Sequence, residues 1–257
     1  MINNCKMKIS VITITFNAEQ FLRETMQSVL DQSYTNIEYI IVDGKSTDGT
    51  VEIIKSFEDG MKAKSIEFRW ISEPDSGLYD AMNKGLRMAT GDFVWFVNAG
   101  DRIFDGTIAQ KVADAFAANE QADVVYGQTQ IIDQNGAPCG ERHKIAPKNL
   151  QFKSLLNGLV VCHQSIVVRR SVAPNYNLQY RYSADYDWVC GVLKQSRCNV
   201  YIDGYLSKFM ISGISAKNRK ASWVERYKIM CHHFGIVRTL LAHIAIVIKY
   251  PFSRQLK

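Results

Sequence analysis

The sequence predicts an α/β fold in which a mixed, mainly parallel sheet is flanked by helices. Short β-rich runs alternate with amphipathic helical patterns through the first half of the chain, as they do in βαβ units. Polar side chains follow four of these runs, and sheets of this kind bind ligands at the carboxyl ends of their strands. The 257 residues, 47% of them hydrophobic, are enough to bury one large core.

The first half is expected to contain four strands with helices between them. The strands are the β-branched or aromatic runs at 8–15, 37–43, 68–72 and 93–97. One helix follows Asn17, which can cap it, a second is capped by the polar segment 46–48, and a third spans 80–90. The strands end in the polar segments 15–17, Asp43, 73–75 and 98–101, which we expect to meet at one edge of the sheet.

The second half is less regular. Strands are expected at 123–133 and 165–169, with a loop at 134–149 between them. Segments 157–164 and 175–187 are expected to be loops, the second leading into a short helix from Asp187.

The positive charge is concentrated at the C-terminal end. The formal net charge is +6, yet residues 217–257 contain nine Lys or Arg and a single acid, Glu225. The preceding 216 residues are slightly acidic. This distribution argues against a nucleic-acid groove through the fold and indicates an anionic partner for the C-terminal end.

The cysteines and the N-terminus favour a reducing compartment, and we expect the protein in the cytoplasm. None of the six cysteines forms a CxxC pair. Cys162-His163 and the segment 231–233 lack zinc-site spacing, so a structural role is expected for both. Residues 1–8 contain no apolar run typical of a signal peptide.

Several nucleotide-binding and hydrolase motifs are absent. No GxGxxG follows the first strand, and no Walker lysine loop or GxSxG elbow occurs. A ligand with a diphosphate must therefore be held without a glycine-rich cradle, and a metal ion is the usual substitute. Asp101 follows an all-apolar strand and is a candidate ligand for Mg²⁺ or Mn²⁺, the alternative being a helix cap.

Two other carboxylate positions are candidates for chemistry. Asp43 ends the second strand and can accept hydrogen bonds from a nucleobase or ribose, although it also begins a turn-and-cap segment. Asp185 and Asp187 lie in SADYDW, and either can be a general base or a helix cap. The residues by themselves do not choose between them.

Three ordered segments carry a family resemblance: VITITFNAEQFLRETMQSVLDQSY, VDGKSTDGT and SEPDSGLYDAMNKGLRMATGDFVWFVNAGD. Together they resemble family 2 glycosyltransferases of the GT-A fold, and in particular bacterial enzymes of surface-polysaccharide assembly with the YDAMNKG pattern. The similarity covers residues 7–105 closely and continues more weakly through VCHQS and SADYDW to about residue 190.

The resemblance assigns expected roles to individual residues. Thr15, Asn17 and Asp43 would contact the nucleoside, with Asp75, Asn83 and Lys84 lining the donor site. Asn98, Ala99 and Gly100 would belong to the metal motif and the donor site, with Asp101 reaching the metal. Asp185 would be the catalytic base, which favours it over Asp187. His163 and Gln164 would contact the acceptor or the diphosphate, or else pack in the core.

The chain departs from the family pattern at two positions. Gly100 stands where many relatives have a second acidic residue of the metal motif, and Ala184 stands where a glutamate usually precedes the base. These departures put the strength of metal binding and the tuning of the base in question.

The activity implied by the resemblance is an inverting, metal-dependent transfer of a hexosyl or N-acetylhexosaminyl group from a nucleotide-diphosphate sugar, with uridine the preferred base. The acceptor would be a hydroxyl of a saccharide or a lipid-linked saccharide in the assembly of O-antigen, capsule or exopolysaccharide. Residues 1–105 would bind the nucleotide sugar and 106–215 would face the acceptor, within one GT-A domain. The rival hypotheses are a sugar nucleotidyltransferase and a non-catalytic sugar-nucleotide-binding or membrane scaffold protein.

Residues 216–257 are expected to form a basic, apolar helical tail. Its apolar stretch at 234–252 is interrupted by Arg238 and His243, and its longest clean run is too short to cross a bilayer. Basic flanks with Trp223 and Tyr250 favour a helix lying on the inner face of the cytoplasmic membrane. The alternative is a helix docked on the body or on a second subunit, as in a homodimer.

Overall fold

The computed structural model describes residues 7–211 and 218–253 of the chain. Its strands are β1 (Ile9–Thr15), β2 (Ile37–Asp43), β3 (Glu67–Ser72), β4 (Phe93–Phe96), β5 (Arg102–Ile103), β6 (Val124–Ile132), β7 (Pro138–Glu141), β8 (Ile166–Arg169) and β9 (Asn199–Met210). Its helices are α1 (Leu22–Leu30), α2 (Thr50–Ser56), α3 (Glu58–Ala63), α4 (Leu78–Met88), α5 (Ile108–Ala118), α6 (Ala184–Gln195), α8 (Arg219–Phe234) and α9 (Ile236–Ser253). The 3₁₀ turns are η1 (Phe152–Asn157), η2 (His163–Ser165) and η3 (Arg170–Val172).

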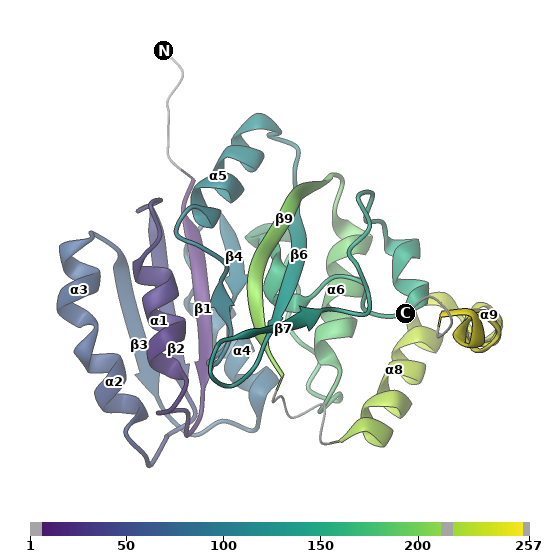
Figure 1. The fold of residues 1–257 in the computed structure, drawn as a ribbon, viewed down its shortest axis with the longest axis horizontal. Coiled ribbons are helices and arrows are strands. Elements are labelled where there is room, and N and C mark those ends of the chain that lie inside the picture. Colours follow the sequence, from purple (N-terminus) through teal and green to yellow (C-terminus); the bar gives the residue numbers. More distant parts are fainter. Residues whose placement is uncertain (1–6, 212–217, 254–257) are drawn as a thin grey trace.

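The described strands form one mixed sheet, which confirms the predicted fold class. Their order is β3-β2-β1-β4-β8-β6-β9-β5, with β7 paired to β6. The first four strands in that order are parallel, whereas β8 runs antiparallel to both β4 and β6. Figure 1 shows β3 at one side of the molecule and α8 and α9 at the other.

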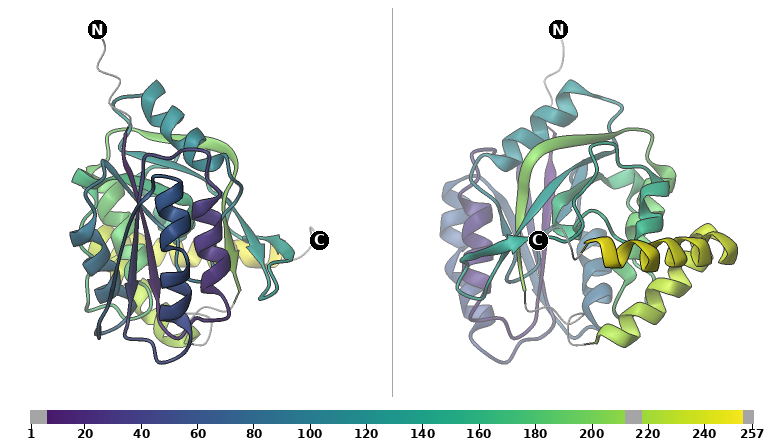
Figure 2. Two further views of the ribbon diagram at one scale, coloured as in Figure 1. Left: turned by 90° about the vertical axis from the view of Figure 1, so that its left-hand side faces the viewer. Right: turned by 45° about the vertical axis from the view of Figure 1, so that its right-hand side comes forward.

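Each face of the sheet buries its own hydrophobic core, because successive side chains of a strand point to opposite faces. Ile12, Ile40 and Phe96 point to the face covered by α4 and α6. Val11 and Trp95 point to the opposite face, where α1 and α5 pack. Figure 2 shows helices on both sides of the strands.

The register of the parallel strands brings the predicted polar ends together. Thr15 lies opposite Asp43 across the β1–β2 pair, and Asp43 lies opposite Ser72 across the β2–β3 pair. Ala99, just after β4, donates its backbone N–H to the carbonyl of Ile14 (3.1 Å). The carboxyl ends of these strands therefore form one edge, as expected.

Asn17 does not cap a helix, so that expectation was wrong. Its backbone is left-handed (φ 46°), and α1 begins five residues later at Leu22. The side-chain Oδ1 of Asn17 instead accepts a hydrogen bond from the backbone N–H of Thr47 (2.9 Å). The loop after β2 offers it a backbone donor, and this contact replaces the cap.

The second half differs most from expectation. The twelve-residue strand β9 was not predicted, since its side chains are mostly half-buried and Asp203-Gly204 interrupts the strand pattern, Gly204 having φ 107°. The short strand β7 lies inside the expected loop 134–149. Helix α6 begins at Ala184 rather than at Asp187.

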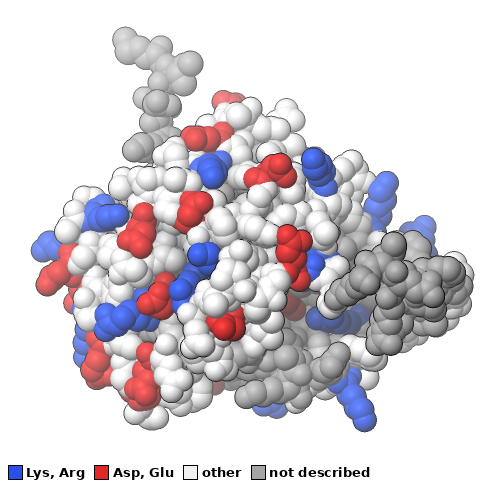
Figure 3. Space-filling model, viewed as in Figure 1, with Lys and Arg blue, Asp and Glu red and all other residues white. Residues whose placement is uncertain are grey.

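Helix α8 is attached to the body, whereas α9 continues beyond it after a break at Gly235 (φ 84°). The imidazole of His233 lies 2.7 Å from an Asp187 carboxylate oxygen, and the Ser222 and Ser183 hydroxyls are 2.9 Å apart. Within the described residues, no helix is long and apolar enough to cross a bilayer. On the face shown in Figure 3, acidic side chains spread over the left and centre, while Lys and Arg predominate beside the tail helices.

Candidate active site

Asp43 and Thr15 lie side by side at the sheet edge and are both buried. Asp43 Oδ2 accepts hydrogen bonds from the backbone N–H of Ser46 (2.9 Å) and the hydroxyl of Ser72 (2.6 Å). The Thr15 hydroxyl oxygen is buried and has no hydrogen-bond partner in the described part of the chain. A buried hydroxyl without a partner costs free energy, so this position is suited to a polar ligand.

Asp75 reaches the turn that follows Asp43. A Cβ on Gly44 would lie 2.6 Å from Asp75 Oδ2, so glycine is required for this approach. The same Cβ would lie 3.3 Å from the ring of Phe16, which is 62% exposed. A carboxylate pair and an exposed aromatic ring therefore surround one place at the sheet edge. Phe16 was missed from the sequence, although its position directly after the first strand is a signal for it.

Two residues of the YDAMNKG motif hold neighbouring segments in position. Lys84 donates from Nζ to the carbonyl of Pro74 (2.7 Å) and lies 2.8 Å from a Glu73 carboxylate oxygen, which fixes the segment that carries Asp75. The Asn83 amide donates to the Tyr176 carbonyl (3.0 Å) and accepts from the Tyr176 N–H (2.7 Å). In this arrangement Asn83 joins α4 to the segment that contains Tyr176, and its contact with a donor stays a prediction.

Asp185 lies in the first turn of α6, half-buried. The hydroxyl of Tyr79, from α4, donates to its Oδ1 at 3.4 Å. Burial raises the pKa of Asp185, while Arg226 and Arg142 act in the opposite direction. A half-buried carboxylate with a raised pKa has the properties of a general base.

Asp187, the competing candidate, is paired with His233 of α8 and serves to join two helices. Tyr79 was missed as a site residue, although it is the first letter of the motif. Its long hydrogen bond links α4 directly to Asp185.

The turn 98–101 has the geometry of a tight connection beside β1. The N–H of Asp101 donates to the carbonyl of Asn98 (2.9 Å), and Gly100 has φ 99°. A Cβ on Gly100 would overlap the methyl group of Met210. The left-handed backbone therefore favours glycine at this position, and a side chain there would also displace the end of Met210. Asn98 Oδ1 is buried without a hydrogen-bond partner among the described residues.

Asp101 lies inside the fold and is 5% exposed. Its two carboxylate oxygens accept hydrogen bonds from Gln164 Nε2 (2.7 Å) and the backbone N–H of Met210 (3.1 Å). Burial raises its pKa to about 7, and the two hydrogen bonds lower it only in part. The side chain thus joins the 98–101 turn to η2 and to the end of β9.

The protein contacts of Asp101 would compete with a metal ion for its oxygens. Mg²⁺ and Mn²⁺ are bound by one or two protein carboxylates together with phosphate oxygens and water. Each Asp101 oxygen accepts one hydrogen bond from the protein, and the part of the chain that is described holds no group of three or more His, Cys, Asp or Glu able to bind a metal. The metal-binding role of Asp101 stays a prediction.

His163 and Gln164 are buried core residues in this structure. The His163 ring bonds to the Tyr176 hydroxyl and packs against Phe96, and burial lowers its pKa to about 3. Gln164 joins Asp101 to the thiol of Cys162, which donates to Gln164 Oε1 at 3.0 Å. In this structure both residues pack in the core, which was the alternative expectation. Their contact with an acceptor or a diphosphate stays a prediction.

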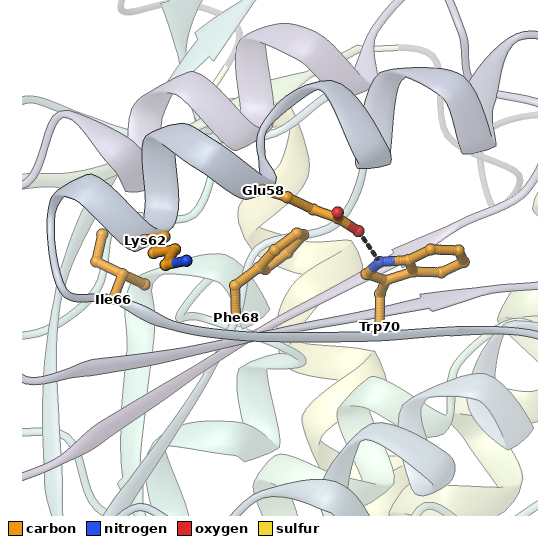
Figure 4. A pocket seen from close by; sticks show the side chains of 5 residues that line it. All are labelled: Glu58, Lys62, Ile66, Phe68 and Trp70. Carbon is orange, nitrogen blue, oxygen red and sulfur yellow. Dashed lines mark hydrogen bonds between the residues drawn. The ribbon is translucent and has the colours of Figure 1, made fainter.

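A surface hollow of about 340 Å³ lies away from these residues, on the edge strand β3. Figure 4 shows Phe68 and Trp70 of β3 facing α3, with the Trp70 indole donating to Glu58 Oε1 at 3.0 Å. It holds none of the predicted site residues, so volume by itself is a poor guide to the site.

Comparison with known proteins agrees with this geometry. The sequence pattern of the family described as glycosyl transferase family 2 matches residues 10–176, which is more than half of the chain. The chain belongs to this family. A glycosyltransferase of Mycobacterium tuberculosis named for PGL/p-HBAD biosynthesis is 32% identical over 183 residues, covering 70% of this chain and 67% of the relative. An uncharacterized glycosyltransferase of Haemophilus influenzae is 25% identical over 236 residues, covering 90% of this chain and 92% of that protein.

Solved structures share the fold of this family 2 glycosyltransferase. A TarS fragment from S. aureus in complex with UDP superposes with a TM-score of 0.70 at 17% identity, covering 98% of this chain and 76% of the fragment. The chain covers 43% of a longer TarS structure. The mannosyltransferase PcManGT from Pyrobaculum calidifontis, in complex with GDP-Man and Mn²⁺, has a TM-score of 0.64 at 15% identity, covering 95% of this chain and 76% of its own.

Proposed function

We propose that this glycosyltransferase moves a sugar from a UDP-sugar to an acceptor hydroxyl with inversion at the anomeric carbon. The observation that carries the proposal is Asp185, a half-buried carboxylate of raised pKa that Tyr79 links to the motif helix α4. Similar folds solved with UDP and with UDP-GlcNAc support the choice of donor.

Asp185 acts as the base in a single displacement. Its carboxylate takes the proton of the acceptor hydroxyl, and the acceptor oxygen forms a bond to the anomeric carbon. The bond from that carbon to the diphosphate oxygen breaks, and its electron pair leaves with UDP. The raised pKa makes Asp185 a stronger base than an exposed aspartate.

The sheet edge binds the nucleoside in this proposal. Thr15 supplies a buried hydroxyl that has no protein partner among the described residues, and Asp43 supplies a fixed carboxylate beside it. Phe16 offers an exposed ring on which a base can stack. Asn17 and Asp75 hold the two loops around this place.

The requirement for a divalent metal is tested separately, because the proposed displacement is described without one. The similar fold solved with Mn²⁺ supports a metal, whereas the occupied oxygens of Asp101 do not. Thermal stabilisation by UDP is to be measured with EDTA and with added Mn²⁺ or Mg²⁺. A metal requirement predicts stabilisation only in the presence of the cation.

The acceptor and the setting follow from the sequence resemblance. We propose transfer of a hexosyl or N-acetylhexosaminyl group to a saccharide or a lipid-linked saccharide during bacterial surface-polysaccharide assembly, on the cytoplasmic side of the membrane. The charge and exposed apolar side chains of the tail support a peripheral contact with the membrane.

The two missing acids do not by themselves favour a non-catalytic scaffold, because each position has a structural reason for its residue. Gly100 has a left-handed backbone that disfavours a side chain, and Ala184 is completely buried in the core. The nucleotidyltransferase hypothesis lacks the glycine-rich loop near Thr15 that a triphosphate would require.

The substitution Asp185→Asn tests the base. We expect the rate of UDP release in the presence of acceptor to fall by about 10²–10⁴-fold, with UDP affinity retained. Asp187→Asn is the matched control two residues away, and it should lower thermal stability while turnover stays within a few-fold of wild type. Normal turnover of Asp185→Asn would rule out this base.

A further inference from the structure

Three cations, Arg142, Lys144 and Arg226, lie close enough to affect one another, and the two arginines also act on Asp185. None of the three takes part in an ion pair within the described residues. They were not predicted from the sequence, because Arg226 is one of many basic residues in the tail and the other two lie in an expected loop.

Arg142 and Lys144 converge on one turn that leads out of η1. Arg142 Nη2 donates to the carbonyl of Leu159 (3.2 Å), and Lys144 Nζ donates to the carbonyl of Asn157 (2.5 Å). The hydroxyl of Tyr186, next to Asp185, donates to the carbonyl of Leu155 in η1 (2.6 Å). The turn that holds the two cations is therefore attached to the start of α6.

Arg226 approaches the start of α6 from α8, which lies beside α6 in Figure 1. The carboxylate of Glu225 accepts hydrogen bonds from the backbone N–H groups of Arg181 and Tyr182, both at 2.8 Å. Ser222, one helical turn before Arg226, contacts Ser183 and so directs that face of α8 toward Asp185. The Arg226 Nε is buried and has no hydrogen-bond partner among the described residues.

The three cations repel one another, so their proximity has a cost. Burial of the ammonium group lowers the pKa of Lys144 to about 8, with contributions from Arg226 and Arg142, although part of this side chain is exposed. Asp185 offsets this repulsion in part, since Arg226 and Arg142 stabilise its ionised form, but none of the three cations forms an ion pair with it. Cations held together without ion pairs are suited to binding an anion of high charge density.

We propose that Arg142, Lys144 and Arg226 form a binding site for a phosphoryl group next to Asp185. The proposal rests on the proposed function in taking Asp185 as the residue that faces the acceptor. A phosphoryl group can come from the acceptor or from the donor diphosphate. Arg142 also lines a hollow of about 280 Å³ on the half predicted to face the acceptor, and this favours the acceptor as the source. Glu141 and Asp203 line the same hollow, so the phosphoryl group would lie on the Arg142 side of it, toward Lys144 and Arg226.

The test measures binding of inorganic pyrophosphate and of UDP by titration calorimetry on the full chain. Arg142→Gln, Lys144→Gln and Arg226→Gln are compared singly with wild type. Lys148→Gln and Lys153→Gln, two exposed lysines of the same segment, are the matched controls. Each site variant should weaken pyrophosphate binding by about tenfold or more, since a hydrogen bond to a charged group is lost. The controls should change little.

A second titration identifies the source. Pyrophosphate is titrated into protein saturated with UDP. If pyrophosphate still binds to UDP-saturated wild type and binds more weakly to the UDP-saturated variants, the three cations bind a phosphoryl group of the acceptor. Weaker UDP binding in the variants, with pyrophosphate excluded by UDP, assigns the site to the donor diphosphate.

Unchanged affinity for both probes in all three variants overturns the proposal. Asp43→Asn separates that result from a failure of the proposed function, because it should weaken UDP binding whatever the cations do. Lys144→Gln keeps the test valid if a buried arginine variant fails to fold, since the Lys144 side chain is partly exposed. In wild type, pyrophosphate affinity should also fall between pH 7 and pH 9, and less so in Lys144→Gln.

Discussion

At the scale of single residues, the contacts of the carboxylates divide them by role. Asp43 and Asp101 are both buried and accept hydrogen bonds from the protein, Asp43 from Ser46 and Ser72 and Asp101 from Gln164 and Met210. Asp185 and Asp187 are both half-buried in α6, but Asp187 pairs with His233 whereas Asp185 has only the long hydrogen bond from Tyr79 and one from the next backbone N–H. Because all four are aspartates, residue type does not separate these roles, whereas the partner of each carboxylate distinguishes Asp185 from Asp187.

The pH dependence of catalysis should report the environment of Asp185. Its pKa is raised by burial, so kcat/KM should fall on acidification at a pH above the ordinary aspartate pKa of about 3.9. Arg226 stabilises the ionised form, and Arg226→Gln should therefore move the acidic limb to higher pH. Steady-state rates from pH 4 to pH 9 check this, with Lys148→Gln as control. A limb shifted to lower pH would contradict it.

Protonation of Asp101 should make the free energy of unfolding depend on pH, and Asp101→Asn should remove this dependence. The folded-state pKa of about 7 lies above the unfolded value, so protonation stabilises the fold. Protonated Asp101 contributes at most about 4 kcal/mol to the free energy of unfolding. This contribution is complete below about pH 4 and is lost as the pH rises to about 7. Urea unfolding of wild type and Asp101→Asn at pH 5 and pH 8 measures it.

Comparison with the variant is needed because His163 acts in the opposite direction. Burial lowers its pKa to about 3, so the stability that it contributes is lost as the pH falls. Asp101→Asn keeps the pH-dependent contribution of His163 to the free energy of unfolding and loses that of Asp101. An equal pH slope in the two proteins would show that Asp101 does not titrate in this range.

At the scale of elements, α4 shows why its motif has this sequence. Tyr79 reaches Asp185, Asn83 holds Tyr176, and Lys84 holds the segment before the helix. Ala81 is completely buried on the core face. One short motif can therefore make four different contacts, because neighbouring residues on a helix point in different directions.

Gly85 sets the distance between α4 and the sheet. A Cβ there would lie 2.5 Å from Ile12 Cγ2, whereas a Cβ on Gly60 of α3 would lie 3.3 Å from the end of the flexible Leu30 side chain. Both alanine variants gain the same helix propensity. Gly85→Ala should therefore be less stable than Gly60→Ala by about 1–3 kcal/mol, the usual cost of overpacking. Urea denaturation compares them, and equal stabilities would disprove the close packing.

At the scale of the whole molecule, the tail presents an exposed apolar surface beside its basic residues. Trp223 is 67% exposed on α8, and Val237 and Leu241 are 71% and 61% exposed on α9. Contiguous exposed apolar side chains of this kind mark an interaction surface. The charge of this end favours an anionic membrane as its partner.

Binding to vesicles tests the membrane contact. Wild type should sediment with vesicles that contain anionic phospholipid and much less with neutral ones, and added salt should release it. The double variant Leu240→Glu with Leu241→Glu should lose most of this binding, whereas Leu178→Glu, an exposed leucine outside the tail, should keep it. A concentration-dependent dimer that the double variant abolishes, without vesicle binding, would instead assign this surface to a second subunit.

Local patterns in the sequence determined the first half of the fold. The strands β1 to β4 were predicted within a residue or two. β1, β2 and β4 are mostly apolar runs buried on both faces, whereas the half-buried edge strand β3 was found from its aromatic residues. The positions of Thr15 and Asp43 followed, since the ends of parallel strands must meet at one edge. Strand β9 was missed because half-buried side chains and Asp203-Gly204 blur its alternation.

Only the tertiary structure decided which polar residues are free to act. The sequence determined that aspartates end strands and lie at the start of α6, and that YDAMNKG forms part of a helix. It did not determine that Gln164 and Met210 bind Asp101, or that Arg142 and Lys144 from one segment and Arg226 from the tail come close to one another. These contacts join residues far apart in sequence, and such pairings depend on how whole elements pack rather than on local preference.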